Sequence, residues 1–194
     1  MIVGVLGLQG AVREHVRSLG LLGMEARVVK RLADLDGLDA LILPGGESTT
    51  ISLLAENGIL PRLRDLASEG FPLFGTCAGM ILLATEAEGR EHSGIDAIDI
   101  SVARNASGRQ VDSFETSLKV DGVGDDIPGV FIRAPYVTRL GERVRPMAYH
   151  DGFVVMAREG SVLVASFHPE LTEDLRIHRY FIEEVVDREK EDGK

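Results

Sequence analysis

Short apolar runs alternate with longer amphipathic stretches through the first half of the chain. The runs have the length of buried strands, and the stretches between them place apolar residues at helical spacing. We therefore expect four strands, at residues 2–6, 25–29, 40–43 and 73–76. Helices are expected at 12–22, 51–54, 61–69 and 78–84. Ser48 stands where it would cap the second of these helices.

The second half of the chain is richer in strands. Apolar runs typical of strands lie at 98–102, 114–120, 130–132, 147–149, 153–157 and 162–167. Asp151-Gly152 is a strong hairpin signal, so some of these strands are antiparallel. Residues 85–96 are polar and contain glycine, which predicts a loop, and 173–190 are expected to form a closing helix.

Strands that alternate with helices predict βαβ units and a doubly wound sheet. The expected fold class is α/β, with a mostly parallel central sheet and antiparallel strands in the C-terminal half. We expect a single three-layer domain over residues 1–194, which ends in a charged, frayed tail at 187–194. Such sheets bind ligands at the carboxyl ends of their strands. Gly7 to Gly10, Pro44 to Ser48 and Gly75 to Gly79 all follow strands, so they are expected to converge there.

Composition narrows the classes of function. Acidic residues outnumber basic ones by 31 to 21, and no Lys/Arg cluster offsets the net charge of −10, so nucleic acid is not an expected partner. No apolar run approaches the ~20 residues that span a bilayer, and the N-terminus lacks the basic lead of a signal peptide. The single cysteine cannot form a disulfide within one chain, and a free thiol suits the reducing cytoplasm.

That cysteine, Cys77, lies in Gly75-Thr76-Cys77-Ala78-Gly79 between an expected strand and an expected helix. The pattern G-x-C-x-G is the thiol form of the nucleophile elbow, whose tight turn requires small residues two positions to either side. A helix N-terminus also favours the thiolate. The alternative is a buried structural cysteine, which is common.

His168-Pro169-Glu170 offers a base for that thiol. Proline disfavours the helical region for the residue before it, so the segment is expected to be extended there. Residues two apart in an extended chain point to the same side, so Glu170 could orient the imidazole of His168. Taken alone, the tripeptide is more typical of a surface turn. The nucleophile elbow elsewhere in the chain reverses that balance.

A glycine pair at Gly45-Gly46 can turn backbone N–H groups toward a ligand. The N–H groups of Gly46 and of Ala78, after the nucleophile, are candidates for an oxyanion hole. The other histidines are expected to have no role in the chemistry. His178 is expected on the surface of the last helix, His92 in a polar loop and His150 beside a hairpin turn. No histidine pair has metal-ligand spacing, and with one cysteine a zinc site is not expected. We expect no cofactor.

These motifs, in this order, resemble the class I (triad) glutamine amidotransferases. Seven ordered segments resemble more narrowly the PdxT family, the glutaminase subunits of pyridoxal 5′-phosphate synthase. They are Gly7-Leu8-Gln9-Gly10-Ala11 with Glu14-His15, Pro44 to Thr50, Gly75 to Met80, Arg104-Asn105, Gly108 to Glu115, Phe131 to Pro135 and Ser166 to Thr172. The resemblance implies a flavodoxin-like fold and hydrolysis of L-glutamine to L-glutamate and ammonia.

The resemblance also implies roles for individual residues. Cys77, His168 and Glu170 match the catalytic triad. Gln9 and Gly10 match a segment that responds to the partner. The positions that match glutamine-binding residues are Gly46, Glu47, Ser48, Arg104, Ile132 and Arg133. The implied partner is a (β/α)₈ barrel synthase of the PdxS type, in an assembly of twelve copies of each subunit. The barrel would use the ammonia with ribose 5-phosphate and glyceraldehyde 3-phosphate to make pyridoxal 5′-phosphate.

Three alternatives remain at this point. The chain could be another class I glutaminase, such as the subunit that serves imidazole-glycerol phosphate synthesis. It could be a scaffold subunit without activity, although a scaffold has no need for an activated thiol. A cysteine hydrolase or chaperone with the same α/β elbow ranks last, because that group lacks the H-P-E segment.

Overall fold

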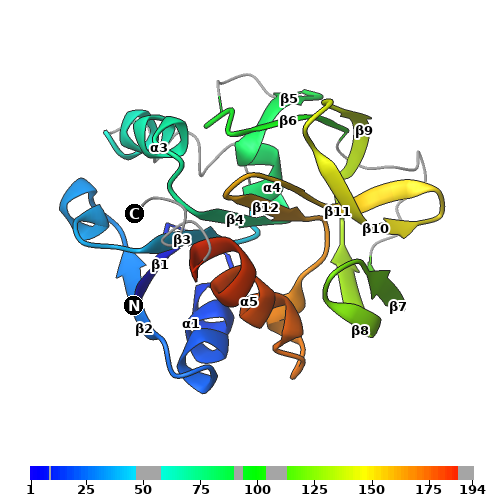
Figure 1. Ribbon diagram of the computed structural model, residues 1–194, viewed down its shortest axis with the longest axis horizontal. Helices are drawn as coiled ribbons and strands as arrows, with labels where there is room; N and C mark the ends of the chain where they lie inside the picture. The colour runs from blue at the N-terminus through cyan, green and yellow to red at the C-terminus, as the bar shows by residue number, and fades with distance from the viewer. Residues whose placement is uncertain (9, 47–57, 90–93, 104–112, 188–194) are drawn as a thin grey trace.

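One sheet of twelve strands organises the part of the chain that the computed structural model describes, which is residues 1–8, 10–46, 58–89, 94–103 and 113–187. Its path runs β2-β1-β3-β4-β12-β11-β10-β7-β8, and β5, β6 and β9 form a branch that joins at β11 (Figure 1). The strands are β1 (Ile2–Leu6), β2 (Glu25–Val29), β3 (Ala40–Leu43), β4 (Leu73–Thr76), β5 (Ala84–Ala87), β6 (Ile98–Ala103), β7 (Ser113–Val120), β8 (Gly124–Ile132), β9 (Tyr136–Leu140), β10 (Arg145–His150), β11 (Phe153–Glu159) and β12 (Val162–Ala165).

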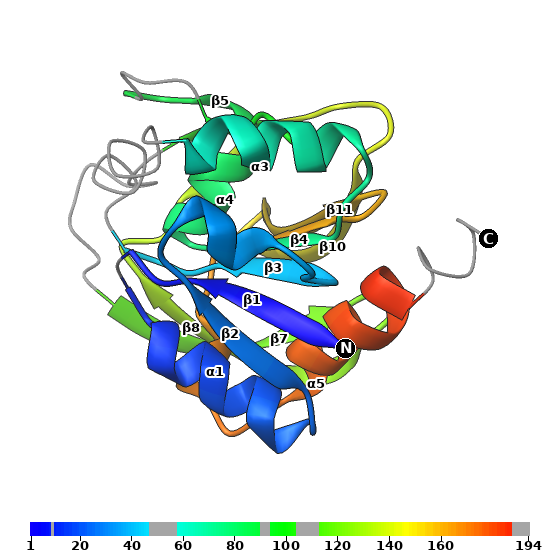
Figure 2. The same cartoon turned by 90° about the vertical axis from the view of Figure 1, so that its left-hand side faces the viewer.

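Helices cover both faces of the parallel part of this sheet. They are α1 (Val12–Leu21), α3 (Ile59–Ser68), α4 (Ala78–Leu83) and α5 (Arg176–Tyr180), and α5 continues as a π-helix, η3 (Phe181–Val186). Short 3₁₀ turns are η1 (Leu32–Leu35) and η2 (Pro169–Leu171). Figure 2 shows α1 and α5 on one side of the sheet and α3 and α4 on the other. The α/β class, the three layers and the mixture of parallel and antiparallel strands are therefore confirmed.

Two apolar cores result from this layering, one on each face of the sheet. The alternation of side chains along β3 divides its residues between them: Leu41 and Leu43 pack with α3 and α4, and Ala40 and Ile42 pack with α1 and η3. All four are fully buried. Strands with both faces covered are expected to read as continuous apolar runs, which is why this region was recognisable in the sequence.

The segment 85–96, expected to be a loop, is partly a strand. Ala84–Ala87 form β5, which pairs in parallel with β6. Thr85 is partly buried and Glu86 is exposed, so two polar residues lie within this short strand. Thr85 Oγ1 donates a hydrogen bond to the carbonyl of Ile100 at 3.0 Å. Pairing with β6 therefore makes a strand of residues whose composition is typical of a loop.

The other differences concern boundaries. Strand β8 begins at Gly124, not at residue 130, and it includes Pro128, which is tolerated because β8 is the last strand on its side of the sheet. Strand β9 was not expected. Helix α3 begins two residues earlier than expected, and the closing helix begins at Arg176, not at 173. The helix at 51–54 and its cap Ser48 lie outside the described residues. Among the described helices, none is long and apolar enough to cross a membrane.

Helix α4 packs closely against strand β3 at Gly79. A Cβ atom built on this glycine would lie 1.9 Å from the carbonyl oxygen of Leu43 and 3.0 Å from its Cβ. Backbone atoms cannot yield as a flexible side chain can. The helix that follows the candidate nucleophile can therefore sit against the sheet only if this residue has no side chain.

We predict that Gly79→Ala lowers the free energy of unfolding by at least about 3 kcal/mol, because α4 must move away from β3. Gly20→Ala is the control, since a Cβ there meets no atom within 4 Å. It should raise stability by about 0.5 kcal/mol through helix propensity. Urea unfolding followed by circular dichroism measures both. Equal stability of the two variants would contradict the close-approach argument.

Candidate active site

The carboxyl ends of parallel strands meet at one edge of the sheet. Gly10 follows β1, Gly45 follows β3, Cys77 follows β4 and His168 follows β12. A Cβ atom built on Gly10 would lie 1.5 Å from the carbonyl oxygen of Gly45, so these two backbones are in direct contact. A Cβ atom on Gly45 would lie 2.5 Å from Cε1 of His168 and 3.3 Å from Cβ of Cys77. The segments expected to converge do so, and His168 joins them.

Cys77 sits on a strained turn between β4 and α4. Its φ of 50° and ψ of −105° lie in a region that costs a non-glycine residue about 1–3 kcal/mol. A Cβ atom on Gly75 would lie 2.6 Å from the carbonyl carbon and oxygen of Gly79, so the turn also requires its flanking glycines. The Cys77 N–H donates to the carbonyl of Ala165 in β12 at 2.8 Å, which ties the turn to the neighbouring strand. This is the geometry of a nucleophile elbow.

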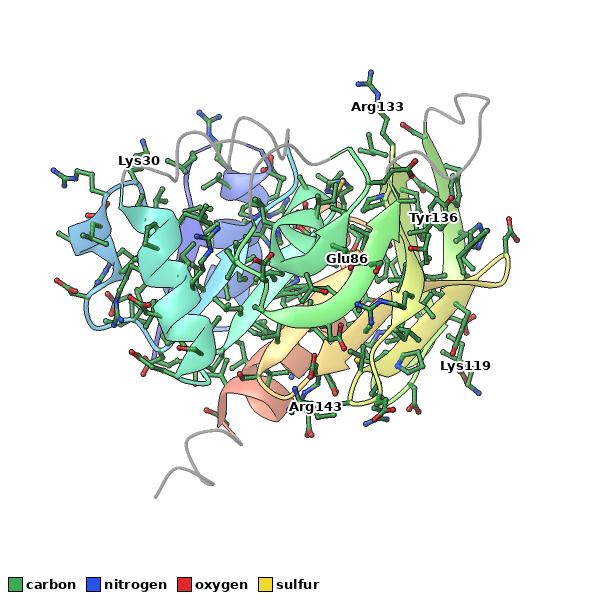
Figure 3. The ribbon with its side chains drawn as sticks, turned by 90° about the horizontal axis from the view of Figure 1, so that it is seen from above. Lys30, Glu86, Lys119, Arg133, Tyr136 and Arg143 are labelled. Carbon is green, nitrogen blue, oxygen red and sulfur yellow. The ribbon has the colours of Figure 1, made fainter. Side chains whose placement is uncertain are left out.

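The thiol of Cys77 is largely buried and faces the end of β8. Its Sγ lies 3.8 Å from the carbonyl oxygen of Ile132. Arg133 follows with a φ of 44° and an exposed side chain. Figure 3 shows this side chain projecting beyond the end of the strand. The structure thus brings the backbone of Ile132 to the thiol and presents Arg133 beside that backbone.

His168 and Glu170 are in contact as the sequence predicts, with Nδ1 and Oε1 2.8 Å apart. The backbone differs from the extended form expected, because Pro169–Leu171 form the 3₁₀ turn η2. Proline at the first position of a helical turn has a suitable φ and lacks the N–H that would be unpaired there. The N–H of His168 donates to the carbonyl of Val130 at 2.8 Å, so β8 supports the segment from the other side.

The ionisation of His168 follows from these contacts. Burial alone disfavours the imidazolium, but hydrogen bonds to Cys77 and Glu170, with the charge of Glu170, outweigh it and raise the pKa of His168 to about 10. His168 is therefore protonated at neutral pH. Because Glu170 occupies Nδ1, the other ring nitrogen, Nε2, is left for Cys77.

The remaining predicted residues divide into two groups. Gln9, Glu47, Ser48 and Arg104 lie outside the described residues. Gly46 is described and exposed, with a φ of 147° that glycine adopts far more readily than other residues. Ala78 is the first residue of α4, so its N–H has no acceptor within its own helix. In the part of the chain that the structure describes, no three His, Cys, Asp or Glu side chains form a group that could hold a metal ion.

Two buried histidines behind the triad were not predicted as part of the site. His178 was expected on the surface, but it is fully buried, as is His15. His15 Nδ1 and His178 Nε2 are 2.9 Å apart, and His15 Nε2 lies 3.5 Å from Oε2 of Glu170. The surface assignment was wrong because His178 stands on the inner side of its helix. A signal was available: each histidine precedes two buried residues at the i+3 and i+4 positions, the spacing of one helix face.

Burial also keeps these two histidines neutral. Desolvation, followed by the charges that His178 and His168 can carry, lowers the pKa of His15 well below its ordinary value. Desolvation lowers the pKa of His178 to about 4. Two uncharged imidazoles therefore lie under the charged pair of His168 and Glu170.

Comparison with known proteins connects this site to one family. Residues 5–187 match the family model of the SNO glutamine amidotransferase family. The pyridoxal 5′-phosphate synthase subunit PdxT of Bacillus mycoides is 55% identical over 184 residues, which are 94% of each chain. A crystal structure of a glutamine amidotransferase is 53% identical, with a TM-score of 0.90 over 94% of this chain and 98% of that one. The structure of PurLQS from Thermotoga maritima matches 93% of this chain and 96% of its own with a TM-score of 0.70, and at 16% identity it shares the fold alone.

We predict that the protein loses stability as the pH falls from 6.5 toward 4. A histidine whose folded pKa is depressed binds its proton more readily in the unfolded chain, so acid favours unfolding in this window. For His178, a shift from 6.5 to about 4 corresponds to about 2 kcal/mol lost between pH 7 and pH 4.5. Urea unfolding at a series of pH values measures this dependence.

The variant His178→Phe should make the pH dependence shallower by the share of His178, since Phe carries no titratable group and the position adjoins the ring of Phe74, while His15 keeps its own share. The control is His150→Phe, at a partly exposed ring that stacks on Phe114 and Phe131, and it should keep the wild-type dependence. An unchanged slope in His178→Phe would contradict the assignment.

Proposed function

The chain belongs to the SNO glutamine amidotransferase family and is a glutamine hydrolase, and we propose that Cys77, His168 and Glu170 carry out the hydrolysis. The observation that carries this proposal is their arrangement. A thiol on a strained elbow adjoins an imidazole that a buried carboxylate holds at 2.8 Å. Residues 1–194 act in this proposal as one glutamine amidotransferase domain.

A positive charge lies beside the sulfur in the resting site. The pKa of His168 is raised to about 10, so its imidazole is protonated at neutral pH. A neighbouring cation favours the thiolate, which is the reactive form of a cysteine and the form that attacks in this proposal. Glu170 stabilises the imidazolium through Nδ1 and keeps Nε2 directed at the sulfur.

The reaction then proceeds in two halves. The thiolate attacks the side-chain amide carbon of glutamine, and the carbonyl π electrons move onto oxygen. The C–N bond breaks as His168 gives its Nε2 proton to the leaving nitrogen, and ammonia departs. A water molecule then gives a proton to the now neutral His168 and attacks the thioester. Glutamate leaves, the thiolate is restored, and the imidazolium is ready for another cycle.

Backbone N–H groups stabilise the oxyanion that forms in both halves. Ala78 contributes the N–H of the residue after the nucleophile, and Gly46 lies next to Gly45, which touches both Cys77 and His168. Glutamine is held by Gly46, Glu47, Ser48, Arg104, Ile132 and Arg133. The exposed guanidinium of Arg133 follows the Ile132 carbonyl that lies 3.8 Å from the sulfur of Cys77, and it is suited to the carboxylate end of the substrate.

The ammonia passes to a partner. Ammonia released into neutral water becomes ammonium, which is not a nucleophile, so direct transfer preserves its reactivity. Relatives with more than half of their residues identical are subunits of pyridoxal 5′-phosphate synthase, which supports that synthase as the partner. We propose docking to a PdxS-type (β/α)₈ barrel, in an assembly of twelve copies of each subunit, in the cytoplasm. The barrel condenses the ammonia with ribose 5-phosphate and glyceraldehyde 3-phosphate, and Gln9-Gly10 respond to docking.

Backbone contacts in the described part of the chain link the segment after β1 to the triad. Gly10 lies against the carbonyl of Gly45, and Gly45 lies against His168 and Cys77. A shift of the segment after β1 therefore has a direct steric path to the reacting groups.

We predict that Cys77→Ala abolishes glutamate release measured with the barrel synthase present, while size-exclusion chromatography still detects the complex. The sulfur forms the covalent bond to the substrate in this mechanism, so the rate of glutamate release should fall at least about 10⁴-fold. Wild-type glutamate release by the variant would refute the proposal. Substituting the barrel of imidazole-glycerol phosphate synthase should leave the wild-type subunit unstimulated, and stimulation by that barrel would favour the other class I glutaminase.

A second prediction concerns Gly45. In Gly45→Ala the new methyl group would lie 2.5 Å from Cε1 of His168, so the imidazole must move away from the sulfur. We expect the turnover number to fall about 100-fold, the scale of a displacement near 1 Å in a catalytic group. Gly20→Ala, far from the edge, should retain full turnover. Stopped assays of glutamate formation measure both, and full activity of Gly45→Ala would contradict the geometry described here.

A further inference from the structure

A row of buried polar side chains extends the triad inward, beneath the sheet. His15 on α1, Thr76 at the end of β4, Glu170 on η2 and His178 on α5 come from four separate elements, and all four residues are at most 4% exposed. Their contacts run from His178 to His15 at 2.9 Å, from His15 to Thr76 Oγ1 at 3.3 Å and from His15 to Glu170 at 3.5 Å. Buried polar groups are costly unless they are paired, so this row calls for a physical reason.

The ring protons in this row can be assigned from the acceptors around them. Nε2 of His15 faces Oγ1 of Thr76 at 3.3 Å and Oε2 of Glu170 at 3.5 Å. Because the carboxylate only accepts hydrogen bonds and the hydroxyl can also accept, we assign a proton to this nitrogen. A neutral His15 then has no proton on Nδ1, so Nε2 of His178 donates a hydrogen bond to this nitrogen. Nδ1 of a neutral His178 in turn carries no proton, and this atom has no hydrogen-bond partner among the described residues. With this assignment, both ring protons lie on the sides that face Glu170.

The two carboxylate oxygens of Glu170 differ in their hydrogen-bond partners. Oε1 accepts from His168, but Oε2 is buried and lacks a partner in good hydrogen-bond geometry within the described residues. Nε2 of His15 lies 3.5 Å from this oxygen and 3.3 Å from Oγ1 of Thr76. Catalytic hydrogen bonds are often long without substrate and shorten in the complex. A neutral imidazole can support this oxygen without adding a charge that would compete with His168.

We propose that His15 is a positioning residue of the glutaminase centre, which holds Glu170 through Oε2 so that Oε1 stays directed at Nδ1 of His168. His178 sets the tautomer of His15, and the inference rests on the proposed function. Without the Nε2–H of His15, the carboxylate of Glu170 is free to rotate toward Thr76. It is also free to bring both of its oxygens close to Nδ1 of His168. Either movement turns Nε2 of His168 away from the sulfur of Cys77.

This role differs measurably from that of an ordinary core residue. His15 is separated from the substrate by Glu170 and His168, so its loss should lower kcat and leave KM for glutamine unchanged. A residue that only fills space would alter stability, and an apolar side chain of similar volume would replace it. Leucine provides that replacement. Glutamine restores a donor, because its amide nitrogen lies as far along the side chain as Nε2 of histidine.

The experiment measures kcat and KM for glutamate release in the complete complex with the synthase, together with unfolding in urea. We expect His15→Leu to lower kcat about 10- to 100-fold, the scale for loss of a hydrogen-bond partner one contact away from a reacting group. His15→Gln should recover most of this loss. Val185→Ala makes an apolar cavity in the same core and should lower stability while keeping kcat.

The inference is overturned if His15→Leu keeps the wild-type kcat, if it changes KM alone, or if His15→Gln is impaired as strongly as His15→Leu. These outcomes are distinct from failure of the proposed function. That failure would appear in the reference proteins, as a wild-type complex that releases no glutamate or a Cys77→Ala complex that releases it at the wild-type rate.

Discussion

The parallel pairing of β4 with β12 is the constraint on which the rest of the site depends. Ala165 lies opposite Thr76, so Cys77 and Ser166 leave the sheet side by side, although 88 residues lie between them in the chain. The hydrogen bond from Cys77 N–H to the carbonyl of Ala165 extends this pairing past the end of β4. A single-residue change of register would move His168 by about 3.3 Å along the strand and out of reach of the sulfur. The apolar faces of both strands oppose such a slip, because each must stay buried.

The site then combines strain with close packing. Cys77 holds a backbone conformation that an isolated chain avoids, and the surrounding contacts keep it there. Glycines at the crossing points let β3, α4 and the segment after β1 approach within van der Waals distance. This close packing restricts the position of the Cys77 side chain. Through the same contacts, a partner that displaces one segment would move the others. Rigidity at the elbow and sensitivity to docking have the same structural origin.

One charged pair is buried among the described residues of the triad. The imidazolium of His168 and the carboxylate of Glu170 form a buried pair, in which the opposite charges offset each other at 2.8 Å. Two neutral histidines lie beneath them where apolar residues would pack as well. Their burial lowers acid stability, since protonation of either favours the unfolded chain. A cost of this kind is understandable if the row of side chains serves the triad above it.

Local patterns in the sequence determined much of this protein. The apolar runs identified the parallel strands because both faces of those strands are buried, and the elbow and the H-P-E segment are local arrangements whose chemistry depends on a few adjacent residues. The sequence could not reveal that Ala84–Ala87 form a strand, because polar residues stand in its middle and pairing with β6 determines the structure. Nor could it show that Gly45 touches His168 or that His15 and His178 lie under Glu170. Those contacts join segments that are distant in the chain, and only the order of strands and the packing of α1 and α5 on one face bring them together.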